Sequence, residues 1–143
     1  MAAAAERYVT IGMAEDLLRL SDTRVAQLRN QDPRFPPHAV EIHEQRLIRR
    51  GWREEAITAY RRGKEPDGAE PPQRYLGYSL ISERLGVTAE RVRQLEDSDP
   101  RFPAAAVELV GPRRSRRRQT IHKGWRSEDI DAYVTARKTP SAR

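Results

Sequence analysis

Apolar residues near the start of the chain recur at spacings that predict two short helices. Ile11, Ala14 and Leu18 follow the i, i+3, i+7 spacing of an amphipathic helix. Val25 and Leu28 would form the buried face of a second helix directly downstream. The polar residues between these positions face solvent in this arrangement, so each helix buries a single narrow face.

Residue types that start and stop helices set the limits of the second helix. Ser21 suits an N-cap, because its hydroxyl can accept a hydrogen bond from a free amide of the first turn. Asp32-Pro33 ends the helix, because proline disfavours helical geometry in the residue before it. Two short helices joined by a tight turn form a helix-turn-helix.

The chain beyond this turn predicts a hairpin and a third helix. Residues 39–42 are expected to form a short strand, and a return strand around Leu47-Ile48 would close the hairpin. Trp52 precedes the third helix and is expected to pack over the hairpin, while Ile57 and Tyr60 face inward from that helix. A hairpin that follows a helix-turn-helix is a wing.

The same pattern occurs twice, so the chain is one module repeated. Aligned without a gap, residues 8–41 and 75–108 are identical at 14 of 34 positions. After a six-residue insertion, Gly51-Trp52-Arg53 matches Gly124-Trp125-Arg126. One difference falls between the first two helices. The second repeat has Gly86 there, well suited to a left-handed residue, whereas Arg19 in the first repeat predicts a looser or differently built turn.

The expected fold is mainly α with small β-hairpin wings, arranged as two tandem winged helix-turn-helix domains. Residues 64–74 contain three prolines and a glycine without apolar periodicity, which indicates a linker. The predicted units are a flexible N-terminal tail (1–7), a first domain (8–63), the Pro-rich linker (64–74), a second domain (75–137) and a flexible C-terminal tail (138–143).

Positive charge is concentrated in one part of the chain. The net charge is +6, but residues 111–126 hold six Arg, one Lys and no acid, which leaves −1 for the remainder. A basic segment without compensating acids favours a polyanionic partner over a merely solvated surface.

The order of these motifs resembles a known family. Leu85-Gly86-Val87-Thr88, Arg91-Val92, Phe102-Pro103 and Gly124-Trp125-Arg126 lie in the order found in the winged helix-turn-helix of the MerR superfamily. The compact AlpA-like and excisionase-like members are the most similar. The resemblance implies double-stranded DNA as the partner, with the second helix in the major groove. The chain lacks the long dimerisation helix and effector domain of full-length MerR regulators, so no small-molecule effector is expected.

Within this motif, the exposed face of each second helix carries the candidates for reading bases. Arg24 and Gln27 are three residues apart and hence neighbours on one helix face. Arginine can bind guanine and glutamine can bind adenine with two hydrogen bonds each. The two modules are expected to prefer related but unequal half-sites. The base-reading candidates are Thr23, Arg24, Gln27, Glu90, Arg91, Arg93 and Gln94.

A second group of basic residues is expected to contact the DNA backbone from the wings and turns. For Arg34 and Arg101 a second interpretation stands beside it: each could simply pair with the neighbouring aspartate. The full group is Arg34, Arg46, Arg49, Arg50, Arg101, Arg113, Arg114, Arg116, Arg117, Arg118 and Lys123. Because five arginines lie between positions 113 and 118, the second module is expected to supply more of the salt-sensitive affinity.

Other classes of function find little support in the sequence. There is no cysteine, and His38, His43 and His122 have no accompanying ligand pattern, so no metal or other cofactor is predicted. No catalytic constellation stands out, so the chain is not expected to be an enzyme. No apolar run approaches membrane-spanning length, and a cytoplasmic, nucleoid-associated protein without membrane contact is expected.

The leading hypothesis is a sequence-specific, non-enzymatic DNA-binding protein with two reading heads. It would act as a transcription regulator or as a recombination directionality factor of a mobile element, with a recombinase or further copies of itself along DNA as protein partners. One alternative is a plasmid partition or DNA-packaging protein that uses the same heads. Another is a protein-interaction adaptor with only the second head on DNA.

Overall fold

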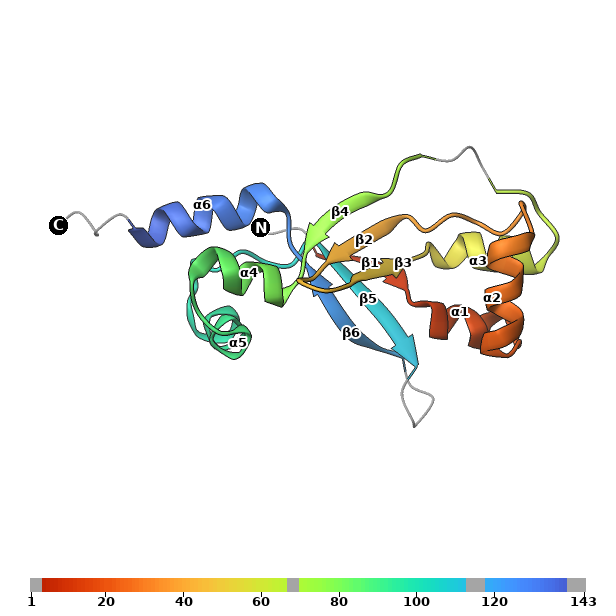
Figure 1. The fold of residues 1–143 in the computed structure, drawn as a ribbon, viewed down its shortest axis with the longest axis horizontal. Helices are drawn as coiled ribbons and strands as arrows, with labels where there is room; N and C mark the ends of the chain where they lie inside the picture. Colours follow the sequence, from red (N-terminus) through yellow and green to blue (C-terminus); the bar gives the residue numbers. More distant parts are fainter. Residues whose placement is uncertain (1–3, 67–69, 113–117, 139–143) are drawn as a thin grey trace.

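The computed structural model describes residues 4–66, 70–112 and 118–138 (Figure 1). The two repeats form the same series of elements. The first contains β1 (Glu6–Val9), α1 (Ile11–Leu18), α2 (Asp22–Gln31), β2 (Val40–His43), β3 (Ile48–Gly51) and α3 (Glu54–Arg61). The second contains β4 (Gln73–Leu76), α4 (Tyr78–Leu85), α5 (Ala89–Ser98), β5 (Val107–Pro112), β6 (Arg118–Gly124) and α6 (Ser127–Lys138).

The expectation of a mainly α protein was wrong. Within the described residues the fold is mixed α/β, with six helices and six strands in two three-stranded sheets. The predicted hairpins β2–β3 and β5–β6 are present. What the prediction missed is a third strand in each sheet, which converts an exposed two-stranded hairpin into part of a core. An isolated two-stranded hairpin is marginally stable at best, so the added strand matters energetically.

Each added strand comes from the other repeat. β1 pairs in parallel with β5, placing Tyr8 opposite Leu109, and β4 pairs in parallel with β2, placing Tyr75 opposite Ile42. The strand orders are therefore β1-β5-β6 and β3-β2-β4. Exchanging the two repeats reproduces the same pairings, which is the signature of a pseudo-twofold axis. Segments assigned to the N-terminal tail and the linker contribute to these strands, because β1 begins at Glu6 and β4 at Gln73.

The last residue of each exchanged strand pairs with its own repeat. Val9 forms an antiparallel bridge with Trp52, and Leu76 forms one with Trp125. The Val9 amide donates to the Trp52 carbonyl at 2.8 Å, and the Leu76 amide donates to the Trp125 carbonyl at 2.8 Å. The first helix of each repeat starts two residues later, so the bridge joins the sheets to the heads.

The two sheets share a buried core. Its buried members are Tyr8, Val40, Ile42, Tyr75, Val107 and Leu109. Glycine permits the close approach of the sheets: a Cβ added at Gly124 would lie 2.8 Å from the Tyr75 Cβ and 3.0 Å from Ile42 Cγ1. Gly51 occupies the equivalent place, where an added Cβ would lie 2.4 Å from Leu109 Cδ2. Each glycine of the repeated Gly-Trp motif thus faces the sheet that contains the other hairpin.

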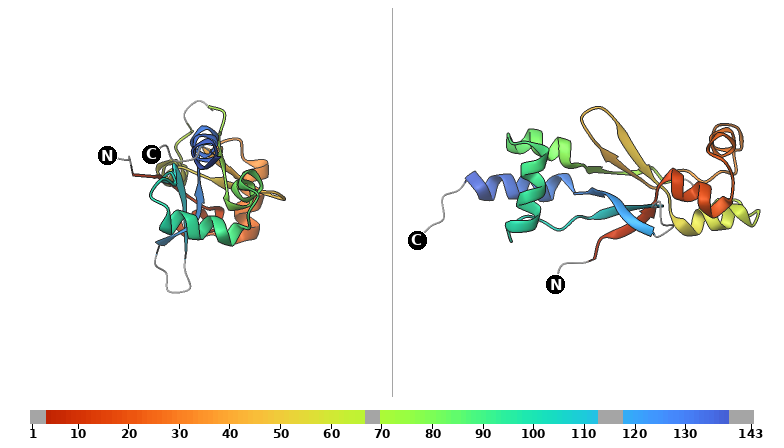
Figure 2. Two further views of the ribbon diagram at one scale, coloured as in Figure 1. Left: turned by 90° about the vertical axis from the view of Figure 1, so that its left-hand side faces the viewer. Right: turned by 90° about the horizontal axis from the view of Figure 1, so that it is seen from below.

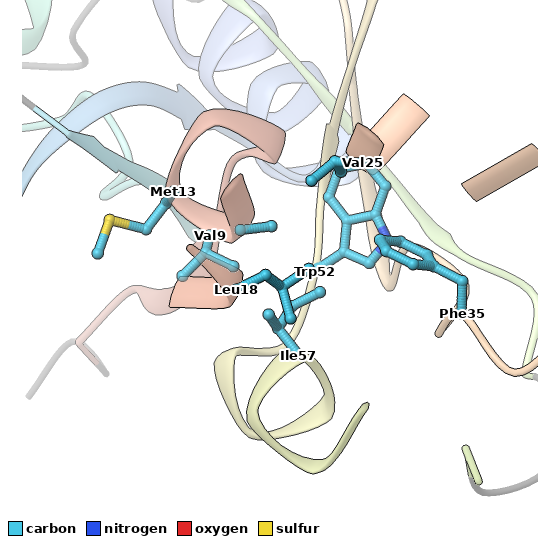
Figure 3. Close-up of a cluster of buried hydrophobic side chains, with 8 residues drawn as sticks. Val9, Met13, Leu18, Val25, Phe35, Trp52 and Ile57 are labelled. Carbon is cyan, nitrogen blue, oxygen red and sulfur yellow. The ribbon is translucent and has the colours of Figure 1, made fainter. Parts of the chain in front are cut away.

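Each head has its own separate core. In the first head Trp52 is 2% exposed, and Figure 3 shows Val25 and Phe35 beside its ring. Its Nε1 donates to the Pro36 carbonyl at 3.0 Å, and Trp125 Nε1 donates to the Pro103 carbonyl at 2.9 Å. Both tryptophans are core residues, as the sequence predicted. The phenylalanine-proline turn therefore holds each hairpin to its helices.

The heads lie at opposite ends of an elongated molecule, with the two sheets between them (Figure 1). The first head (α1, α2 and α3) is at one end and the second (α4, α5 and α6) at the other, and Figure 2 shows the same arrangement from two further sides. Among the described residues, no helix is both long and apolar enough to cross a membrane.

Candidate nucleic-acid interface

The turn between the first two helices has the same geometry in both heads. Gly86 adopts the left-handed conformation with φ 70°, and Arg19 adopts it as well, with φ 55°. The prediction of a looser turn in the first repeat was therefore wrong. The Arg19 amide donates to the Asp16 carbonyl at 3.2 Å, and the Gly86 amide donates to the Glu83 carbonyl at 3.3 Å. The requirements of the helix end outweigh the cost of placing a side chain at a positive φ.

The predicted caps of the second helices are confirmed. The Ser21 hydroxyl accepts from the Arg24 amide at 3.2 Å, and the Thr88 hydroxyl accepts from the Arg91 amide at 3.1 Å. Val25 and its equivalent Val92 are completely buried. The opposite face of each helix is therefore fixed toward solvent.

The far end of each second helix is tied to the third helix. The Tyr60 hydroxyl donates to Asp32 at 2.7 Å, and the Tyr133 hydroxyl donates to Asp99 at 2.7 Å. Burial, followed by the Asp32 hydrogen bond, raises the pKa of Tyr60 to about 12. Hydrogen bonds from the Arg101 amide and from Tyr133 lower the pKa of Asp99 to about 2. Both aspartates therefore stay charged at neutral pH and anchor the helix ends.

All seven predicted base-reading residues are exposed on these two helices. The structure places Arg and Gln side by side in both heads. Arg24 Nη1 donates to Gln27 Oε1 at 3.4 Å, and Arg91 Nη1 donates to Gln94 Oε1 at 3.2 Å. The same polar pair is thus presented at the same place on each head.

In the second head, the base-reading candidate Arg93 belongs to a local network of contacts. The Arg93 guanidinium stacks over the Tyr78 ring, 4.7 Å from the ring centre. The Tyr78 hydroxyl donates to Glu96, and Lys123 Nζ donates to the same carboxylate at 2.9 Å. Lys123, predicted to face DNA phosphates, is paired with a carboxylate of α5. Burial and the Glu96 hydrogen bond raise the pKa of Tyr78, which keeps this hydroxyl protonated.

The first head has different residues at these positions, and its second helix is more basic. Equivalent to Tyr78, Arg93, Glu96 and Lys123 are Ile11, Ala26, Arg29 and Arg50. The salt bridge of the second head is replaced by two exposed arginines in the first. Helix α2 sums to +1 and helix α5 to −1. The second helices of the two heads therefore differ in charge as well as in base-reading candidates.

The hairpins cross over to the opposite head. The Gln45 amide donates to the Ser79 hydroxyl at 2.9 Å, so the turn of the first hairpin contacts the start of α4. The Thr10 amide donates to the Val110 carbonyl at 3.0 Å, so β5 contacts the start of α1. Sequence reasoning missed this crossing, since no local pattern around Ser79 or Thr10 reveals it.

Two arginines that were predicted to contact the DNA backbone form ion pairs with aspartates. Arg34 Nε lies 3.6 Å from Asp32 Oδ1, and Arg101 Nε lies 3.3 Å from Asp99 Oδ1. This pairing is the second interpretation that the sequence left open. Both arginine side chains remain more than half exposed.

The remaining hairpin arginines occupy four different situations. Arg46 and Arg50 are exposed, whereas Arg49 is partly buried and contacts the other hairpin. Arg113, Arg114, Arg116 and Arg117 lie outside the described residues. Arg118 is the first residue of β6, and only its backbone is described.

The histidines have structural contacts. His38 and His43 each place Nε2 within 2.9 Å of the Glu41 carboxylate, which lowers the pKa of Glu41. His122 contacts Arg49, and burial together with that positive charge lowers its pKa to about 4. Across the described parts of the chain, no group of three or more His, Cys, Asp or Glu side chains is placed to hold a metal ion.

Comparisons with family models, with curated proteins and with solved structures found no match to this chain.

Proposed function

We propose that the chain is a sequence-specific, double-stranded DNA-binding protein with two reading heads. The observation that carries the proposal is the Arg–Gln pair on the exposed face of each second helix, Arg24 with Gln27 and Arg91 with Gln94. In both heads this pair lies in the first two turns of a helix whose opposite face is buried and whose two ends are anchored.

The chemistry of the pair suits the major groove. Arginine donates two hydrogen bonds to guanine O6 and N7, and glutamine binds adenine N6 and N7. Each such pair contributes about 1–3 kcal/mol of discrimination against a wrong base. The hydrogen bond between Arg and Gln already restricts the rotamers of both side chains in the free protein. Less side-chain entropy is therefore lost on binding, which favours a preorganised contact.

Electrostatic attraction supports the same function. The net charge is +6, and the positive excess lies at residues 111–126 in the second hairpin and its surroundings. Arg46, Arg50 and Arg29 add exposed positive charge near the first hairpin and α2. Such groups bind phosphates irrespective of sequence and supply most nonspecific affinity.

In the cell the protein would act as a transcription regulator or a recombination directionality factor of a mobile element, or in plasmid partition or DNA packaging. The adaptor alternative, with only the second head on DNA, is less favoured. β5 runs to the start of α1, where the Thr10 amide donates to the Val110 carbonyl, so the end of β5 lies beside the first head. The second helix of that head, α2, is also more basic than its equivalent α5.

The experiment is a selection from a random duplex library with the full chain, followed by affinity measurements on the enriched sequence by fluorescence anisotropy. Arg24→Ala and Gln94→Ala should each weaken binding to the enriched duplex about 5- to 150-fold. They should leave binding to an unrelated duplex within about twofold, because phosphate contacts carry that binding.

Arg62→Ala is the matched control, since Arg62 is an exposed arginine just after α3 and belongs to neither of the two second helices. Equal losses on specific and unrelated duplexes for Arg24→Ala, or no enrichment of any duplex, would overturn the proposal.

A further inference from the structure

The two heads are held in a fixed relation by the strands that they exchange. β1 leaves the first head to join β5, and β4 leaves the second head to join β2. The core between the sheets draws three residues from each repeat, and all six are buried. Moving one head against the other would break two strand pairings and open this core. The Pro-rich connection between the repeats is therefore not what sets their geometry.

The contacts between the repeats are reciprocal, as a twofold axis requires. Gly51 approaches Leu109 of the second repeat, and its equivalent Gly124 approaches Ile42 of the first. On the axis itself, two equivalent positions meet: Arg49 Nη1 lies 3.3 Å from His122 Nε2. Each contact from the first repeat to the second has an equivalent contact from the second to the first. The heads are therefore related by rotation about an axis across the middle of the molecule.

The two second helices lie on adjacent sides of the molecule, both toward the lower right of the left-hand view of Figure 2. In the left-hand view of Figure 2, along the length of the molecule, α5 (green) runs along the lower side and α2 (orange) along the right. The turn of the first hairpin, between β2 and β3, points to the right in the same view, the side on which α2 lies. A duplex laid along the molecule at the lower right of that view would contact both helices.

We infer that the target is an inverted pair of unequal half-sites at one spacing on one duplex. The inference rests on the proposed function. A protein twofold axis coincides with a DNA dyad when its two reading helices enter successive major grooves, so the half-sites read in opposite directions. They are unequal because Thr23 and Ala26 of α2 correspond to Glu90 and Arg93 of α5. Arg93 is moreover held on Tyr78, whereas Ala26 has no such side chain.

The DNA test uses duplexes built from the half-sites enriched by the full chain. The two half-sites are placed inverted, direct or everted, and the spacer of the inverted duplex is then lengthened by 5 base pairs, about half a turn. The inverted arrangement at the selected spacing should bind at least tenfold more tightly than every other one. Inserting six Gly-Ser residues between positions 68 and 69 should change that affinity less than twofold.

A second test needs no DNA. The chain has no cysteine, so Asn30→Cys and Asp97→Cys, at equivalent exposed positions of α2 and α5, allow two spin labels to be attached selectively. Pulsed electron paramagnetic resonance should give one narrow distance distribution, unchanged by the Gly-Ser insertion. A broad distribution, or one that shifts with the insertion, would overturn the fixed arrangement.

The outcomes separate the two claims. If no duplex is enriched, the proposed function fails and the inverted site fails with it. If a duplex is enriched but a direct repeat, a single half-site or several spacings bind equally well, the proposed function stands and the inference alone is overturned.

Discussion

Arg49 and His122 occupy equivalent positions in the two repeats, and they contact each other. Arg49 Nη1 lies 3.3 Å from His122 Nε2, across the pseudo-twofold axis. In an assembly of two identical modules the same residue would meet itself here. Two arginines would repel, whereas a neutral imidazole can accept a hydrogen bond from the guanidinium. Divergence of the two repeats therefore improves the contact at the centre of the molecule.

This contact makes stability depend on pH in a defined window. Burial, and secondly the charge of Arg49, lower the pKa of His122 to about 4. Above pH 6.5 the imidazole is neutral in both the folded and the unfolded chain. Between about pH 6.5 and pH 4 only the unfolded chain binds the proton, so the free energy of unfolding falls as the pH falls. The loss is about 1–3 kcal/mol, reduced from the full shift by partial solvent access.

Urea denaturation of the wild type and of His122→Gln between pH 7.5 and pH 4 measures this effect. Glutamine keeps an acceptor for Arg49 but does not titrate, so the variant should lose less stability over that range. His38 and His43 are present in both proteins and cancel in the comparison. Parallel stability curves for the two proteins would refute the assignment.

The close approach of the sheets predicts a second effect. In Gly124→Ala the new methyl group would lie 2.8 Å from Tyr75 Cβ and 2.9 Å from Val107 Cγ2, which forces the sheets apart. Overpacking of this kind typically costs about 1–3 kcal/mol, and the midpoint of urea denaturation should fall accordingly.

Gly12→Ala provides the control for that substitution. Gly12 lies in α1, and an added Cβ there would come no closer than 3.7 Å to the atoms around it. Alanine should leave stability unchanged or raise it by up to about 1 kcal/mol, because it is the better helix former. A Gly124→Ala protein as stable as the wild type would contradict the packing described for the two sheets.

The turn between α1 and α2 predicts a stabilising substitution. Arg19 has φ 55°, which costs roughly 1 kcal/mol for a residue with a side chain, whereas the equivalent Gly86 has φ 70° without that cost. Arg19→Gly should therefore stabilise the chain, by somewhat less than 1 kcal/mol because glycine also gains entropy on unfolding.

The reverse change, Gly86→Ala, serves as the matched comparison and should destabilise by about 1 kcal/mol. Both values come from thermal and urea denaturation of the full chain. A destabilised Arg19→Gly protein would mean that the Arg19 side chain contributes more than its backbone strain costs.

The helices and hairpins could be predicted because their signals are local. Ser21 and Thr88 cap helices whose buried positions repeat within four residues, and the buried Val25 leaves only one face for Arg24 and Gln27. The Arg–Gln pairs of the candidate site were predictable for the same reason. Their placement follows from helix period alone.

The exchanged strands had no such signal. β1 and β4 are four residues long, and each begins with two exposed residues, so neither shows the alternation that indicates a half-buried strand. The partner of Tyr8 is Leu109, about a hundred positions away. The roles of Arg49 and Lys123 were unpredictable as a consequence, since Arg49 meets the other repeat and Lys123 meets a carboxylate that the first repeat lacks.

The exchange also means that neither repeat carries a complete fold. A chain cut between the repeats would leave β5–β6 without β1 and β2–β3 without β4, so each hairpin would lose its third strand. Affinities of isolated halves would then report unfolding as much as recognition. Experiments that apportion DNA affinity between the heads need the full chain.

The arginine-rich connection of the second hairpin predicts the salt dependence of DNA binding. Replacing Arg113, Arg114, Arg116, Arg117 and Arg118 with glutamine removes five positive charges. If all five contact phosphates, the slope of log K against log salt concentration should become shallower by about 4.5, because each phosphate contact contributes about 0.9. Anisotropy titrations on an unrelated duplex between 50 and 200 mM salt (a range of about fourfold) measure the slope.

The control is the double variant Arg34→Gln with Arg101→Gln. These two guanidinium groups pair with Asp32 and Asp99, so replacing them should change the slope by less than 1. An unchanged slope in the five-residue variant would place the phosphate contacts elsewhere, and Arg29, Arg46 and Arg50 of the first repeat are exposed arginines to replace next.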